Sequence, residues 1–151
     1  MENSFELRRN PIQVIDLIDG HDAFLEFTYI TNPGAAWSMF SEYPQYLTML
    51  AFVALVAIFL FRRHLELHLM PQQIIFGLIC GGICGNLSDR VFREPAEVVD
   101  FIDVFIPIIE YDYPIFNIAD SGIFVGAISY FIWGLLESKR EKQKESLRSD
   151  D

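Results

Sequence analysis

The chain has 151 residues, a length that suits one domain. Hydrophobic residues make up 52% of it and aromatic residues 15%, which is too apolar for an ordinary soluble domain of this size. The formal net charge is -10, and no stretch has the basic character of a nucleic-acid-binding face, so we expect no nucleic-acid partner.

Residues 12–31 carry two short segments in which apolar and polar residues partly alternate. Asp19 and Gly20 lie between these segments and are typical of a tight turn. The pattern predicts two short strands, arranged as a hairpin that lies against the membrane surface or the ends of helices. Asn32 and Gly34 follow and suit a second turn.

Three long apolar segments come next, over residues 46–61, 71–87 and 114–136. Each approaches the 17–25 residues that a helix needs to cross a bilayer, so we predict three transmembrane helices. In the second of them, Gly77, Gly81 and Gly85 recur every four residues and predict a face for close helix packing. Cys80 and Cys84 lie in the same run, and we interpret them as packing residues because two thiols alone make a poor metal site.

The basic residues predict the orientation in the membrane. Arg62 and Arg63 close the first apolar segment, and five further Lys and Arg residues lie in the tail 138–151. These residues belong on the cytoplasmic side, which puts the strands and the acidic loop 88–113 outside. An external N-terminus normally requires a preceding signal or span, so we expect that a first helix is missing from the chain as given.

Polar residues gather at the external ends of the predicted helices. Asn86, Asp89 and Arg90 end the second segment, at spacings that can share a helix face. Asp89 and Arg90 also fit an interfacial charge pair with a backbone-capping role, and the spacing leaves both interpretations open. Placing a carboxylate at the edge of an apolar membrane segment costs free energy, so such a residue is expected to have a function.

A pair of acids that share one site is such a function. Asp100 lies in the external acidic loop, and Asp120 lies near the start of the third segment, three residues after Asn117. Two carboxylates that share a site hold one proton between them, as in aspartic peptidases, and one can then act as base while the other acts as acid. Intramembrane acids also serve proton relays and ion pathways, and the residues alone leave hydrolysis and transport equally open.

Four stretches resemble the lipoprotein signal peptidase family, also called signal peptidase II. They run from Asn32 to Trp37, Gly85 to Arg90, Val98 to Ile102 and Phe116 to Ser121. The resemblance implies a membrane aspartic endopeptidase that removes signal peptides from diacylglyceryl-modified prolipoproteins by cleavage before the lipidated cysteine. It implies that Asp100 and Asp120 are catalytic. It also implies that five polar residues bind substrate or support the two acids: Asn32, Asn86, Asp89, Arg90 and Asn117.

The resemblance further implies a bacterial inner-membrane, multi-pass protein with its active site near the extracytoplasmic face and no metal or organic cofactor. The expected partners are lipid-modified prolipoproteins and membrane lipid, and we expect a monomer. The predicted fold is mainly α: one membrane domain over residues 1–151, with three visible transmembrane helices and a small extracytoplasmic β-sheet near the N-terminus. The family has four such helices, the first with an Asp and a Lys near the site. The alternatives are a non-catalytic protein for proton or ion passage and an inactive truncated peptidase.

Overall fold

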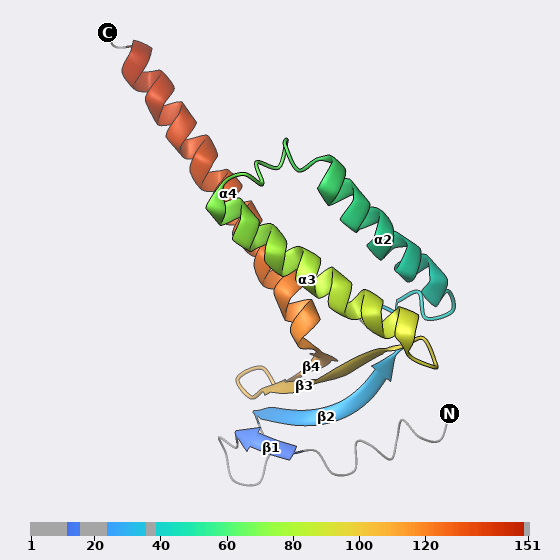
Figure 1. The fold of residues 1–151 in the computed structure, drawn as a ribbon. Coiled ribbons are helices and arrows are strands. Elements are labelled where there is room, and N and C mark those ends of the chain that lie inside the picture. The colour runs from blue at the N-terminus through green and yellow to red at the C-terminus, as the bar shows by residue number, and fades with distance from the viewer. Residues whose placement is uncertain (1–11, 16–23, 36–38, 150–151) are drawn as a thin grey trace.

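The computed structural model describes residues 12–15, 24–35 and 39–149. It consists of a four-stranded sheet across one end of three helices (Figure 1). The strands are β1 (Ile12–Ile15), β2 (Leu25–Asn32), β3 (Val98–Ile106) and β4 (Tyr111–Phe116), in the order β1-β2-β3-β4 with every pair antiparallel. Both strands expected within residues 12–31 are present, whereas the expected turn at Asp19 and Gly20 lies outside the described residues.

The prediction that residues 88–113 form an acidic loop is wrong. This range contains the end of a helix, the whole of β3 and the start of β4. β3 has the sequence VVDFIDVFI, which is rich in β-branched and aromatic residues that favour strands. Asp100 and Asp103 interrupt that pattern. The two acids made the segment resemble a loop, so the strand was not predicted.

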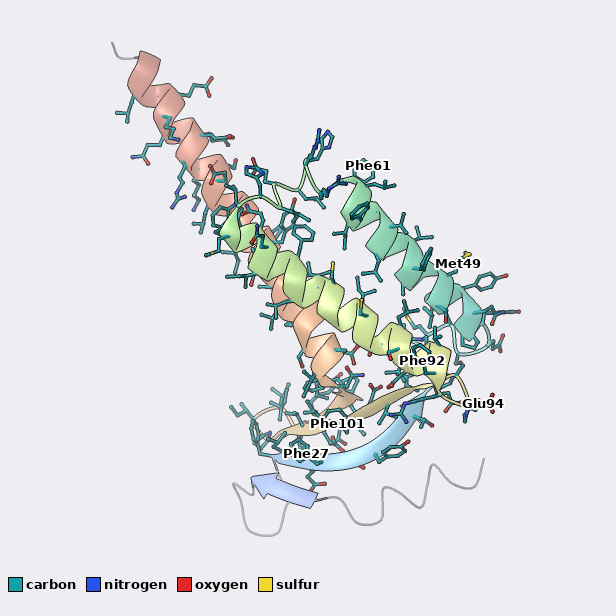
Figure 2. The ribbon with its side chains drawn as sticks, viewed as in Figure 1. Phe27, Met49, Phe61, Phe92, Glu94 and Phe101 are labelled. Atoms are coloured by element: carbon teal, nitrogen blue, oxygen red, sulfur yellow. The ribbon has the colours of Figure 1, made fainter. Side chains whose placement is uncertain are left out.

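The helices are α2 (Pro44–Leu60), α3 (Met70–Phe92) and α4 (Ile118–Ser149). α3 and α4 are long and apolar enough to cross a membrane. α2 has 17 residues, so it is about 26 Å long, slightly short of the roughly 30 Å hydrocarbon core. Whether residues 46–61 span the bilayer therefore stays a prediction. Figure 2 shows Met49 projecting from α2 on the side away from α3, and large apolar side chains are exposed along this helix.

The third apolar segment starts later than predicted. Residues 114–116 belong to β4, and α4 begins at Ile118 and continues as a helix through the basic tail to Ser149. A continuous run of apolar letters therefore contains the end of a strand and the start of a helix. Only the polar residue Asn117 marks the boundary between them.

Close packing of α3 on α4 holds the two long helices together, but the predicted glycine face is displaced. A side-chain carbon added at Gly77 or Gly81 meets nothing within 4 Å. At Gly82 it overlaps the carbonyl oxygen of Ala119, and at Gly126 it lies 2.9 Å from the carbonyl oxygen of Ile75. Of the predicted face only Gly85 meets α4, because the contact follows a different row of positions on α3.

Gly82→Ala is expected to destabilise the chain, whereas Gly81→Ala is not. The new methyl at residue 82 must push the backbone of α4 away, and overpacking of this kind costs about 1–3 kcal/mol. At residue 81 the methyl points into open space and improves helix propensity. Thermal unfolding in detergent compares the two variants directly. Equal midpoints for both would show that α3 and α4 do not pack through Gly82.

Candidate active site

The seven polar residues singled out by the sequence lie on four elements that meet where the sheet crosses the helix ends (Figure 1). The end of β2, the last two turns of α3, the start of β3 and the first turn of α4 each contribute. The hydrogen bonds described below bring all seven into one region. They are Asn32, Asn86, Asp89, Arg90, Asp100, Asn117 and Asp120.

The start of α4 fixes the position of Asp120. The side-chain oxygen of Asn117 accepts a hydrogen bond from the backbone N–H of Asp120 at 2.9 Å. In return, the Asp120 carboxylate accepts one from the backbone N–H of Asn117 at 3.1 Å. This reciprocal pair has the geometry of a capping box, with Asn117 at the N-cap and Asp120 in the third helical position. The pair holds the Asp120 carboxylate in a fixed orientation at the N-terminus of α4.

Asp100 is the buried acid of the site, with 4% of its surface exposed. One of its oxygens accepts a hydrogen bond from the Asn32 side-chain amide at 3.1 Å, and the other accepts one from the Asn117 amide at 2.8 Å. Burial raises the pKa of Asp100 above its ordinary value, and the charge of Asp120 adds to that rise. The two amide donors and Arg90 act in the opposite direction and only partly offset it.

Side-chain amides connect the two acids. The Asn86 amide nitrogen donates to Asp120 at 2.7 Å, and the Asn86 oxygen accepts from the Asn117 amide nitrogen at 3.1 Å. The same Asn117 nitrogen donates to Asp100. A continuous network therefore joins Asp120 to Asp100 through Asn86 and Asn117. The network gives each acid a fixed orientation, as a pair of carboxylates that exchange acid and base roles requires.

Arg90 holds the loop after β2 instead of pairing with either acid of the network. Its guanidinium donates to the backbone oxygen of Gly34 at 2.8 Å and to that of Asn86 at 3.4 Å. The Gly34 N–H donates to the Asn32 side chain, which closes the turn that the sequence predicts. The Nε of Arg90 is buried and has no hydrogen-bond partner among the described residues.

Asp89 supports the start of β3. Its carboxylate pairs with Arg93, one helical turn further on, at 2.8 Å, and accepts a hydrogen bond from the backbone N–H of Val99 at 3.0 Å. Asp89 therefore binds a backbone N–H, but that of a strand instead of a helix end, and the cation in hydrogen-bonding contact with it is Arg93 instead of Arg90. Arg93 is not among the residues predicted from the sequence, although its i,i+4 spacing from Asp89 indicates such a pair.

No group of three or more His, Cys, Asp or Glu side chains suited to a metal ion occurs in residues 12–15, 24–35 and 39–149. Cys80 and Cys84 are both free thiols on α3.

Comparisons with known proteins show similarity in sequence and in fold. The family model described as "Signal peptidase (SPase) II" matches residues 2–136. A bacterial membrane enzyme solved by the in meso method at 2.3 Å resolution is 35% identical, with a TM-score of 0.67 over 87% of this chain and 76% of its own. Another bacterial membrane enzyme, solved by the same method at 1.9 Å resolution, is 33% identical, with a TM-score of 0.64 over 87% of this chain and 82% of its own.

Proposed function

We propose that this chain, which belongs to the signal peptidase II family, is a membrane aspartic endopeptidase that removes signal peptides from diacylglyceryl-modified prolipoproteins. The cut falls just before the lipidated cysteine. The observation that carries the proposal is the amide network that joins Asp100 and Asp120, presented from a strand and a helix at the end of two long apolar helices.

In the proposed reaction Asp100 holds the shared proton and Asp120 is ionised. Burial of Asp100 supports this division. Asp120 takes a proton from a water molecule, which attacks the scissile carbonyl carbon, while Asp100 protonates the carbonyl oxygen. The acids then exchange roles, as the leaving nitrogen receives a proton and the peptide bond breaks.

Five residues support this reaction. Asn86 and Asn117 orient the two acids through the hydrogen bonds described above, and Asn32 holds Asp100 from the side of β2. Asp89 fixes β3 next to Asp100 through the N–H of Val99. Arg90 anchors the Gly34 turn through a hydrogen bond from its guanidinium to the backbone oxygen of Gly34.

The proposed setting is the bacterial inner membrane, which the chain crosses several times. The basic tail belongs on the cytoplasmic side, so the sheet and the active site lie at the extracytoplasmic face. α3 and α4 are the spans best supported by length and composition. The acyl chains of the substrate would lie in the bilayer beside the helices, with the scissile bond at the level of the sheet. This is consistent with a catalytic site built at a helix end.

A proton or ion pathway remains the weaker alternative. A pathway requires polar groups spread across the membrane, whereas all seven polar residues of the site lie where the sheet meets the helix ends. Flux across vesicle membranes that disappears with Asp120→Asn, in a chain that cleaves nothing, would favour this alternative over hydrolysis.

Cleavage of a defined substrate tests the proposal. The purified chain in lipid vesicles is given one prolipoprotein in two forms, with and without the diacylglyceryl group on its cysteine. We expect cleavage of the lipidated form alone, and mass spectrometry should place the new N-terminus at the lipidated cysteine. Equal cleavage of both forms, or a cut at another bond, would contradict the proposed specificity.

The rate of cleavage is expected to fall as the pH rises through the raised pKa of Asp100. Above that pKa both acids are ionised and the proton donor is lost, while at lower pH Asp100 keeps its proton. Asn32→Ala removes a donor that favours the ionised form of Asp100, so the alkaline limb of the profile should move to higher pH. A pH profile of kcat/KM for both proteins checks this. An unmoved limb would mean that another group holds the proton.

A further inference from the structure

The turn between β3 and β4 exposes apolar side chains to an unusual degree. Ile108 has 92% of its surface exposed and Ile109 has 66%. Glu110 adopts a left-handed backbone conformation with φ of 50°, which closes the turn directly after the two isoleucines. Tight turns usually carry Gly, Pro, Asn, Asp or Ser. Two isoleucines at the most exposed point of a hairpin indicate that something apolar covers them.

The strands next to this turn have one apolar face and one face on which acids alternate with Phe101 and Phe105 of β3. Ile106 pairs with Tyr111, and Val104 pairs with Tyr113, so these four side chains share a face of the sheet. The opposite face carries acids from three strands, at the paired positions Glu26 and Asp103 and at Asp112 opposite Phe105. Tyr111 and Tyr113 are both partly exposed, and tyrosine is enriched where a membrane meets water.

The position of Asp100 tells which way the apolar face is turned. Alternation along β3 puts Asp100 on the same face as Val104 and Ile106. Asp100 accepts a hydrogen bond from Asn117 at the start of α4, so this face is turned toward the helix ends. In Figure 1 the turn projects to one side of the lower end of α4, beyond the helices. Its apolar face therefore looks toward the bilayer that α4 crosses, and its acidic face looks away.

The apolar face is also continuous with the surface of α4. β4 ends at Phe116 and α4 begins at Ile118, whose side chain is exposed in the first helical turn. Exposed Phe124 and Val125 follow along the same helix. If α4 spans the membrane, lipid covers these side chains. The hairpin extends that lipid-covered surface sideways from the helix end.

We propose that the β3–β4 turn, through Ile108 and Ile109, inserts into the boundary between headgroups and acyl chains of the leaflet that lies at the active site. The tyrosines lie at the headgroup level, and the acidic face remains in water. This inference rests on the membrane placement of α3 and α4 and not on peptidase chemistry. Its consequence is that lipid, as well as Asp89, fixes the height of β3 and of Asp100 relative to the bilayer.

Fluorescence quenching tests the depth of the turn. A bimane label is attached at Ile108→Cys or at Asp112→Cys in the full chain, with Cys80→Ala and Cys84→Ala, and the protein is placed in phosphatidylcholine–phosphatidylglycerol vesicles. We expect brominated acyl chains to quench the label at residue 108 and iodide in the water to leave it unquenched. The label at residue 112, on the acidic face of the same hairpin, should behave in the opposite way.

Adding Ile109→Asp to the Ile108→Cys chain should abolish quenching by lipid and admit iodide. The helices still hold the protein in the vesicle, so this readout does not depend on overall membrane binding. Equal iodide quenching at residues 108 and 112 would overturn the proposal. Protection of residue 108 from both quenchers, relieved when the protein is diluted in lipid, would also overturn it and would indicate contact with a second copy of the chain.

Prolipoprotein cleavage in the same vesicles separates this inference from the proposed function. An inactive chain whose label at residue 108 is quenched by lipid would refute the peptidase proposal alone. An active chain whose label at residue 108 is open to iodide would refute the membrane contact alone.

Discussion

Asp100→Asn and Asp120→Asn are each expected to abolish prolipoprotein cleavage, with a loss of at least about 10²–10⁴-fold in rate. Asparagine has nearly the shape of aspartate but can neither hold nor release the proton that the pair shares. Because the two acids exchange roles in the proposed reaction, loss of either should stop the cycle. Single-turnover cleavage of a lipidated substrate measures the effect without interference from product release.

Each substitution also changes hydrogen bonds, so the experiment needs a measure of folding. Asn at residue 120 replaces one oxygen that accepts from Asn86 or from the backbone N–H of Asn117. The unfolding midpoint of each variant should therefore be recorded beside its rate. Asp112→Asn is the matched control, because it removes an exposed acid of the neighbouring strand without touching the network. Normal processing by either catalytic variant would refute the assignment of that acid.

The sequence predicted the members of the site better than the elements that carry them. Asn86, Asp89 and Arg90 follow helical spacing, and Asn117 and Asp120 are three apart, so local rules bring each set together. Local spacing does not explain the contact between Asp100 and Asn117. That contact depends on β3, a strand that its two acids made difficult to predict. Its depth near the membrane edge suggested Asp100 as the partner of Asp120, and the resemblance to a known family implied its catalytic role. The structure supplies the reason for its location: β3 pairs with β2, and the backbone N–H of Val99 donates to Asp89.

Two other features lay beyond sequence reasoning for a common reason. The glycines of α3 repeat in more than one row, and only the position of α4 decides that Gly82 is in contact while Gly77 and Gly81 are open. The start of α4 was placed too early because residues 114–116 are as apolar in a strand as in a helix. In both cases the answer depends on a neighbouring element. The residue Asn117 was available as a helix-start signal and would have corrected the boundary.

Substitutions of Asn117 are expected to affect stability and the rate of cleavage to different extents. Its side-chain oxygen caps α4, while its amide nitrogen donates to Asp100 and to Asn86. Serine at an N-cap is about as good as asparagine, but a hydroxyl has one proton and a shorter reach. Both Asn117→Ser and Asn117→Ala lose the buried bonds of the amide, but Asn117→Ser keeps the cap and should therefore be about 1 kcal/mol more stable than Asn117→Ala.

Cleavage should respond differently from stability. Both substitutions remove the amide that joins the two acids, so both should slow cleavage, by about 10²-fold if the amide positions the dyad for proton transfer. The loss of a donor to Asp100 should also move the alkaline limb of the pH profile upward, as for Asn32→Ala, because that bond favours the ionised acid. Ser121→Ala is the control for the first turn of α4, since its hydroxyl donates only to the backbone oxygen of Asn117. If Asn117→Ser cleaves at the wild-type rate, the amide bridge is dispensable, and the cap alone explains why an asparagine stands between the strand and the helix.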